Sequence, residues 1–133
     1  MTLRDDERNT IINYRLNQAV QALEDADFLL NHKKLSLAAN RIYYSLFYAL
    51  TAIALKDGFS TSKHKQLIGW FNKKYIKTSL VDIKYSKLIY SAYENREKGD
   101  YDILFTLTYD EIANSRVHTE EFVNKIIPNL LTQ

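Results

Sequence analysis

The sequence predicts an all-α protein folded as an up-and-down bundle of four to five helices. Only three Gly and one Pro occur in 133 residues, whereas a many-stranded fold needs turn residues at roughly every 8–12 positions. Apolar residues recur with helical spacing over several long stretches, and turn or capping residues lie between those stretches. A chain of this length fits a single domain, residues 1–133.

The first two helices are predicted to be long and antiparallel. Over residues 5–31 one stripe of apolar residues steps by four and three positions, at Ile12, Leu16, Ala19, Leu23, Ala26 and Leu30. Residues 31–34 read as a turn, and a second helix follows over residues 35–57 and stops at Gly58. Between residues 38 and 55, fourteen of eighteen residues are apolar or aromatic, and Arg41 is the one charged residue. Because such a helix must be surrounded by other helices or buried at a subunit interface, we expect it at the centre of the fold.

Three shorter helices complete the predicted bundle. Residues 63–75 favour a third helix, and residues 82–97 favour a fourth, with Ile83, Leu88, Ile89, Ala92 and Tyr93 facing inward. Gly99 and Asp100 are expected to end the fourth helix, and residues 101–107 to form a loop or a single turn. The last helix begins at Thr108, which makes a capping box with Glu111, and Pro128 is expected to kink or fray its end.

The composition excludes several kinds of chemistry. There is no Cys, which rules out disulfides, thiol chemistry and thiolate metal sites. The sequence holds no Gly-rich phosphate loop and no His or carboxylate residues at metal-ligand spacing, so we predict no metal and no cofactor. The charged start lacks the apolar segment of a signal peptide, and the longest apolar stretch, residues 42–55, is shorter than the roughly 20 residues of a membrane span. We therefore expect a cytoplasmic protein that does not bind membranes.

The net charge of +2 is unevenly distributed. Residues 56–98 contain ten Lys and Arg residues against four Asp and Glu residues. Such a basic segment suits a phosphate backbone or an acidic partner. A solvated, Lys-rich helix surface accounts for the same pattern.

Arg41 is the first candidate functional residue, because a guanidinium inside an apolar helix needs an acceptor. Asp27, Glu24 and Glu94 are the candidate partners for a buried ion pair that fixes helix register. The alternative is a role for Arg41 in a cleft that spans a dimer.

Three further residues are candidates for binding. Tyr44 belongs to a run of aromatics at core spacing, although tyrosine hydroxyls can line a polar cleft. His64 lies between two lysines and is either a solvated surface residue or part of a binding site. Arg96 suits the helix dipole at the end of the fourth helix, but Asp100 and Tyr101 follow it closely and together the three residues can hold a phosphate or position a hydroxyl.

Three short motifs in order carry a resemblance to a known family. Arg41-Ile-Tyr-Tyr-Ser-Leu-Phe47 resembles the Arg-x-Tyr-Tyr-x-x-Phe signature of small bacterial and archaeal HEPN proteins. Ser62-Lys-His64 with Phe71 is similar to the family's next stretch, and Arg96-x-x-x-Asp100-Tyr101 looks like its ending. The similarity runs from about residue 19 to residue 122.

The resemblance implies a helical bundle that forms a homodimer, and many such domains act as the toxin beside a minimal nucleotidyltransferase. In the ribonuclease branch of the family, an Arg-x(4–6)-His motif from both protomers forms an RNA-cleaving cleft that needs no metal. Here the first histidine after Arg96 is His118, so the histidine role has no occupant along the sequence. A tyrosine with a reference pKa of about 10 is poorly suited to replace it. Tyr101 instead resembles the tyrosine that the nucleotidyltransferase modifies with AMP in some pairs.

The leading hypothesis is a dimeric protein that binds nucleotide or RNA near Arg41, Tyr44, His64, Arg96, Asp100 and Tyr101 and acts with a minimal nucleotidyltransferase. One alternative is an active metal-independent ribonuclease toxin in which Arg96 is catalytic. The other is a non-catalytic structural or interaction dimer.

Overall fold

The computed structural model describes the backbone of residues 3–101 and 106–133 and the side chains of residues 3–99 and 106–133. These residues form helices connected by turns, and no β-strand occurs among them, so the all-α prediction is confirmed. In order, the elements are α1 (Asp5–Asn31), α2 (Leu35–Lys56), α3 (His64–Phe71), the π-helical turn η1 (Asn72–Ile76), α4 (Ile83–Tyr101), α5 (Tyr109–Glu121), the π-helical turn η2 (Phe122–Ile126) and α6 (Ile127–Leu131).

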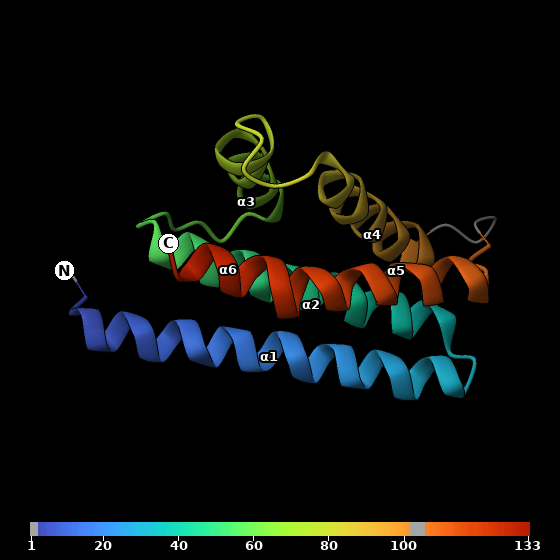
Figure 1. Cartoon of the computed structure of the whole chain (residues 1–133). Helices are drawn as coiled ribbons and strands as arrows, with labels where there is room; N and C mark the ends of the chain where they lie inside the picture. The colour runs from blue at the N-terminus through green and yellow to red at the C-terminus, as the bar shows by residue number, and fades with distance from the viewer. Residues whose placement is uncertain (1–2, 102–105) are drawn as a thin grey trace.

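Helix α2 is the centre of the bundle, as its composition predicts. It packs against each of the other α-helices: α1 runs antiparallel along one side, the rod of α5, η2 and α6 along another, and α3 and α4 cover a third (Figure 1). Ser45, fully buried on α2, donates a hydrogen bond of 2.7 Å to the carbonyl oxygen of Ala19 on α1. This bond satisfies a hydroxyl that would otherwise be costly to bury among apolar side chains.

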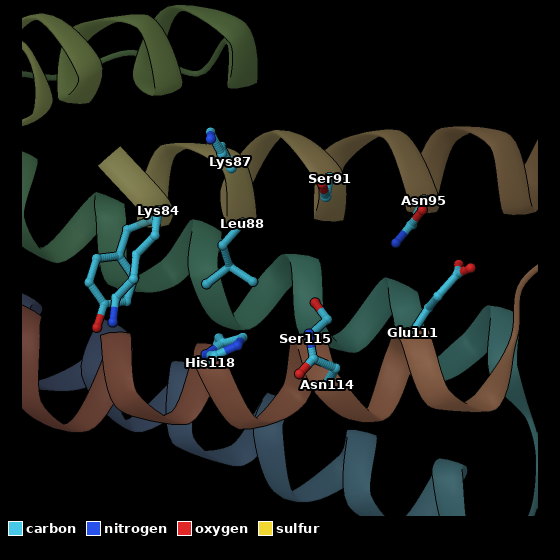
Figure 2. Close-up of a pocket in the computed structure, with 10 residues that line it drawn as sticks. Lys84, Lys87, Leu88, Ser91, Asn95, Glu111, Asn114, Ser115 and His118 are labelled. Atoms are coloured by element: carbon cyan, nitrogen blue, oxygen red, sulfur yellow. The ribbon is translucent and has the colours of Figure 1, made fainter. Parts of the chain in front are cut away.

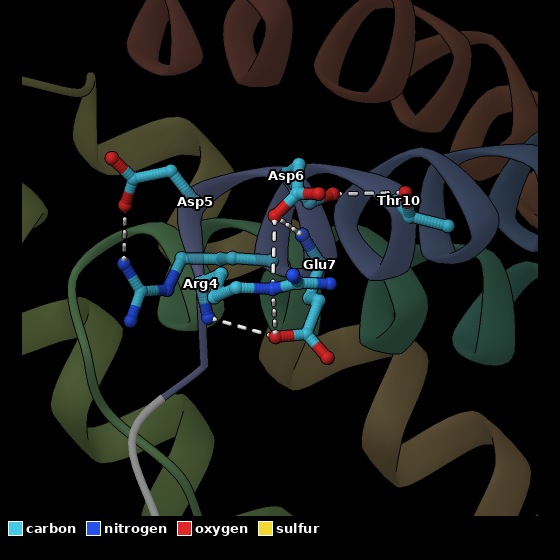
Figure 3. Close-up of polar contacts among 6 residues, drawn as sticks. Arg4, Asp5, Asp6, Glu7 and Thr10 are labelled. Atoms are coloured by element: carbon cyan, nitrogen blue, oxygen red, sulfur yellow. Dashed lines mark hydrogen bonds and ion pairs between the residues drawn. The ribbon is translucent and has the colours of Figure 1, made fainter.

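The start of α1 shows why the helix begins where it does (Figure 3). The Arg4 backbone N–H donates to Glu7 Oε1 at 3.1 Å, and the Glu7 N–H donates to Asp6 Oδ1 at 3.0 Å. The three carboxylates of the first turn also lie at the positive end of the helix dipole. Local charge therefore supports a helix whose buried stripe then packs on α2.

The predicted ends of α1 and α2 are confirmed by their backbone angles. Lys33 adopts a positive φ of 57° in the turn between the helices, and Gly58 adopts a φ of 76° after α2. That left-handed conformation is open to glycine without a steric penalty, so Gly58 suits the end of the helix.

The predicted end of α4 is wrong, because the helix continues past Gly99 to Tyr101. A Cβ atom on Gly99 would approach the Leu107 and Ser36 side chains to 3.3 Å, and Ser36 Oγ donates to the Gly99 carbonyl oxygen at 3.4 Å. Glycine is therefore used here for close packing against the start of α2 and not to break the helix. Residues 102–105 of the predicted loop lie outside the described residues.

Two further expectations need correction. Ile83 was expected to face inward, yet it is 62% exposed at the first position of α4. The third helix ends at Phe71 and continues as η1, so its last predicted residues form a wider π turn.

Helix α5 begins at Tyr109, and the Oγ1 atom of its N-cap, Thr108, accepts from the Glu111 N–H at 3.3 Å, so the predicted capping position of Thr108 is confirmed. The chain then widens into η2 just before Pro128. Proline has no N–H for the carbonyl four residues earlier, and its ring crowds that carbonyl, so a wider turn relieves the clash. Among the helices that the structure describes, none combines the length and the apolar character needed to cross a membrane.

Candidate functional site

Helices α2, α3 and α4 bring two arginines, a histidine and several aromatic rings into one group. We call this group the arginine–aromatic cluster; its members are Arg41, Tyr43, Tyr44, Phe47, His64, Tyr93 and Arg96. Residues 41, 44 and 47 recur on one flank of α2 with helical spacing. That flank is half-buried, which leaves the cluster accessible from solvent.

Arg96 reaches from α4 onto two tyrosines of α2. Its Cζ atom lies 5.3 Å from the ring centroids of both Tyr43 and Tyr44, within cation–π range. The side chain is 21% exposed, and its one ion pair with a described residue is a contact of 3.3 Å between Nη1 and Glu97 Oε1. The Arg96 Nε atom is buried without a hydrogen-bond partner among the described residues. The guanidinium is therefore held in place by rings and keeps unused donors, which suits an anionic ligand.

Arg41 does not form the buried ion pair that was expected from the sequence. Its Nε and Nη2 atoms donate to Asn40 Oδ1 at 3.1 and 2.8 Å, and its Cζ lies 5.1 Å from the Tyr44 ring centroid. Asp27, one of the expected partners, accepts from Arg116 instead. The expectation failed because Arg41 lies on the half-open flank of α2, where a neutral amide and an aromatic ring are sufficient.

His64, at the first position of α3, is joined to α2 through Tyr43. Its Nδ1 atom lies 2.7 Å from the Tyr43 hydroxyl oxygen, and its ring stacks on Phe47 with a centroid separation of 4.1 Å. Burial and, next, the positive charge of Arg96 lower the pKa of His64 below its usual value, while Glu97 acts in the opposite direction. His64 is therefore neutral near pH 7. Burial likewise raises the pKa of Tyr43, so its hydroxyl stays protonated.

The cluster carries excess positive charge. Arg41 and Arg96 both lie against the Tyr44 ring, and Glu97 is the one carboxylate paired with either of them among the described side chains. Two guanidiniums close to one ring repel each other, and an anion placed between them would relieve that repulsion. Guanidinium groups bind phosphate and carboxylate groups through two parallel hydrogen bonds, so a phosphate suits this position.

The structure brings together four of the six residues predicted to bind nucleotide or RNA, namely Arg41, Tyr44, His64 and Arg96. The side chains of Asp100 and Tyr101 lie outside the described residues, although their backbone continues α4. The link between Tyr43 and His64 could not be foreseen from the sequence, because no spacing rule connects α2 to α3. Among the described residues, no group of three or more His, Cys, Asp or Glu side chains is arranged to hold a metal ion.

Comparison with known families agrees with this arrangement of helices and motifs. The family model described as HEPN domain matches residues 12–130, which is most of the chain. The chain is a member of the HEPN domain family. The resemblance that the sequence motifs suggested is therefore confirmed.

Two curated relatives match this HEPN chain over about nine tenths of its length. A protein from Thermotoga maritima named "UPF0332 protein" is 35% identical over 121 residues, which cover 91% of this chain and 92% of the relative. A protein from Methanocaldococcus jannaschii with the printed name "Putative toxin" is 30% identical over 118 residues, covering 89% of this chain and 80% of the relative.

Proposed function

We propose that this HEPN protein binds the phosphate groups of a nucleotide or an RNA at the arginine–aromatic cluster and acts as the toxin-like member of a pair with a minimal nucleotidyltransferase. The observation that carries the proposal is the position of Arg41 and Arg96 on the same Tyr44 ring with one paired carboxylate. The half-exposed aromatic rings beside them offer faces on which bases can stack. The name of the relative from M. jannaschii supports the toxin-like role.

Binding is tested by fluorescence anisotropy with a short fluorescein-labelled single-stranded RNA. Loss of one arginine–phosphate contact lowers affinity roughly tenfold and reduces the slope of log K against log salt by about 1. We therefore expect Arg41→Ala and Arg96→Ala each to weaken binding and flatten the salt dependence between about 50 and 200 mM.

The matched control is Arg15→Ala. Arg15 also lies near a tyrosine, with its Cζ 5.7 Å from the Tyr14 ring centroid, and it donates to Gln18 Oε1 at 2.7 Å, but it belongs to α1 and not to the cluster. If Arg15→Ala weakens RNA binding as much as Arg96→Ala, attraction by overall charge explains the binding and the proposed site is wrong.

The partner and the dimer are parts of the same proposal. The family resemblance of Arg96-x-x-x-Asp100-Tyr101 supports Tyr101 as the residue that a nucleotidyltransferase modifies with AMP. Transfer of AMP from labelled ATP to wild type but not to Tyr101→Phe is the expected result, and equal labelling of both would refute it.

The half-buried rings of Tyr44, Phe47 and Tyr48 on one flank of α2 support a homodimer across that flank. Sedimentation of the pure protein at micromolar concentration tests the dimer, and a strict monomer would contradict it.

A second candidate function, metal-independent RNA cleavage, is favoured by the position of His64. Both His64 and Arg96 contact the rings of Tyr43 and Tyr44, so a neutral imidazole shares its surroundings with the guanidinium although the two are distant in sequence. A neutral histidine can accept the proton of a ribose 2′-hydroxyl while an arginine stabilises the charge on the phosphate.

Cleavage is tested with RNA and with an otherwise identical strand that lacks the 2′-hydroxyl groups. For a ribonuclease, wild type cuts the RNA in the presence of a chelator, binds the modified strand without cutting it, and loses cleavage in both His64→Ala and Arg96→Ala. Binding without cleavage by the wild type would leave the binding proposal standing and reject the ribonuclease.

A further inference from the structure

A groove between α4 and α5 lies on a different flank of α4 from the arginine–aromatic cluster. Its volume is about 480 Å³, and side chains from both helices extend toward it (Figure 2). Ligand pockets typically enclose about 300–1,000 Å³. The groove therefore has the size of a ligand site, and it shares no lining residue with the cluster.

The groove is lined by hydrophilic stripes on its two walls. On α4 the lining residues Leu88, Ser91 and Asn95 recur with steps of three and four, and on α5 Ser115 and His118 are three residues apart. The buried apolar residues of both helices belong to the common core of the bundle. Hydrophilic side chains are therefore left to face each other across the seam between α4 and α5.

Two polar side chains of the groove are half-buried and still have no partner. Asn95 on α4 and Ser115 on α5 make no side-chain hydrogen bond to a described residue. Elsewhere, the half-buried side chains of Asn40 and Asn72 are each hydrogen-bonded. Three more exposed lining side chains are likewise without such a bond to a described residue: Ser91, Asn114 and His118. Unpaired amides and hydroxyls on both walls suit a ligand that donates and accepts along its length.

The two ends of the groove differ in charge. Lys84, Lys87 and His118 line one end, and Glu111 lines the other (Figure 2). Lys84 is paired with Glu121, with Nζ 3.3 Å from Oε1, whereas Lys87 and Glu111 form no ion pair with a described residue. A ligand that complements this groove therefore carries a negative group at the Lys87 end and a positive group at the Glu111 end.

The shape and the walls favour an extended main chain over a ligand built on a flat ring. At a rise of 1.5 Å per residue, α4 advances about 12 Å from Lys87 to Asn95, which is the length of about four residues of extended chain. Among the described residues that line the groove, Tyr85 is the one tyrosine, phenylalanine or tryptophan. Its side chain is buried and donates to Glu121, so the groove presents no such ring face for stacking. A main chain instead supplies an N–H and a carbonyl at each residue, which the unpaired amides and hydroxyls can bind.

We propose that the α4–α5 groove binds the C-terminal end of an extended segment of a partner protein. The terminal carboxylate lies at the end with Lys87 and His118, where an ammonium group and a ring N–H can donate to it. The main chain runs between Asn95 on α4 and Asn114 on α5. Glu111 then lies beside the fourth residue from the carboxyl end and favours Lys or Arg there. This site is independent of the binding proposed for the arginine–aromatic cluster.

The test is fluorescence anisotropy of the full chain with the peptide Gly-Gly-Lys-Ala-Ala-Ala, labelled with fluorescein at its amino end. Its small side chains leave the main chain, the free carboxylate and one lysine as the recognised groups. Two matched probes carry either an amide in place of the terminal carboxylate or Glu in place of Lys. We expect saturable binding of the first peptide and roughly tenfold weaker binding of the amide, because the amide loses a charge-assisted hydrogen bond.

Substitutions assign each part of the peptide to its place in the groove. Lys87→Ala should weaken binding of the free acid and abolish the difference between acid and amide. Asn114→Ala should weaken both probes severalfold, and Glu111→Gln should reduce the preference for Lys over Glu. The matched controls are Lys125→Ala and Asn124→Ala, which alter exposed residues of η2 outside the groove and should leave peptide binding unchanged.

Three results would overturn the site. No saturable binding of the free acid up to millimolar protein rejects the proposed ligand, and so does equal affinity for the acid and the amide. Loss of peptide binding in Arg96→Ala with full retention in Lys87→Ala and Asn114→Ala places the peptide in the arginine–aromatic cluster and rejects the groove. Far-UV circular dichroism confirms that each variant is folded, and RNA binding by Asn114→Ala, expected to be unchanged, separates this proposal from the proposed function.

Discussion

Arg96 and Arg116 offer a matched pair that separates a binding arginine from a structural one. Their side chains are 21% and 23% exposed, so both are half-buried to nearly the same extent. Arg116 on α5 donates from Nη2 to Asp27 Oδ2 on α1 at 2.7 Å and from Nη1 to Glu120. These contacts, with those to Asp27 first, raise the pKa of Arg116, whereas Arg96 rests on two rings with one contact to Glu97.

The change we consider is arginine to methionine, which keeps a long flexible side chain and removes the charge. Arg116→Met removes charge-assisted hydrogen bonds worth about 1.5–3 kcal/mol each. Because Asp27 and Glu120 are nearly half exposed, solvent weakens these bonds, and we expect the free energy of unfolding to fall by about 2–3 kcal/mol in total. Arg96→Met removes two cation–π contacts of about 0.5–1 kcal/mol each and an exposed ion pair worth roughly 0–1 kcal/mol. It also removes a buried Nε–H without a partner, whose desolvation costs about 1–3 kcal/mol. The net loss for Arg96→Met is therefore about 1 kcal/mol or less.

Urea unfolding followed by circular dichroism measures both variants against wild type. The expected order is wild type and Arg96→Met close together, with Arg116→Met clearly less stable. In the anisotropy assay the affinity for RNA should show the opposite pattern. We expect Arg96→Met to lose RNA binding and Arg116→Met to keep it. If Arg96→Met loses as much stability as Arg116→Met, Arg96 is a structural residue and the argument from its unused donors is wrong.

Three further outcomes follow from the packing and the charges. Phe122→Ala, which empties a fully buried position on η2, should lower the free energy of unfolding by about 3–5 kcal/mol in the same urea experiment, and a loss below 1 kcal/mol would contradict the described core. Arg96→Met should raise the pKa of His64 toward its usual value in an NMR titration, because a repelling charge is removed; an unchanged or lowered pKa would show that Arg96 does not act on His64. Since the folded-state pKa of His64 is lowered, the unfolded chain binds more protons below pH about 6.5, so stability should fall as pH drops through that value. His64→Gln should show a shallower fall over the same pH range, and an identical fall in both proteins would assign it to other groups.

The parts of the fold that could be predicted are those in which local pattern and tertiary packing agree. The apolar stripe of α1 and the long apolar run of α2 each predict a helix. Gly58 after α2 and Thr108 before α5 lie at helix ends, as a glycine in the left-handed conformation and a capping threonine are expected to do. Gly99 shows where local reasoning fails. A glycine reads as a helix end along the sequence, but here it allows close packing against Ser36, a residue distant in sequence.

Individual residues of the candidate site could be predicted from the sequence, but the contacts among them could not. Arg41 and Tyr44 are conspicuous because a charge or hydroxyl occurs where core residues are expected, and Arg96 because Asp100 and Tyr101 follow it closely. The partner of Arg41 was not predictable, because counting apolar residues on α2 treats Tyr44, Phe47 and Tyr48 as buried, whereas each is half-buried in the structure. The link from Tyr43 to His64 depends on how α3 folds back on α2, which no local pattern contains.

Arg96 combines a buried Nε atom that has no hydrogen-bond partner among the described residues with a position near a second guanidinium, and this supports a function at the arginine–aromatic cluster. Arg15 also contains a buried Nε without a hydrogen-bond partner among the described residues, but its Nη1 donates to Gln18 Oε1 at 2.7 Å, and Arg116 Nε lies 2.5 Å from Asp27 Oδ1. Among the described residues, the one hydrogen bond of Arg96 is a contact of 3.3 Å to Glu97; Arg96 also lies with Arg41 against one ring and lowers the pKa of His64. Locally unfavourable arrangements of this kind are found in proteins chiefly at functional or strained sites. An anion bound beside the two guanidiniums would offset the positive charge that Arg41 and Arg96 place around the Tyr44 ring.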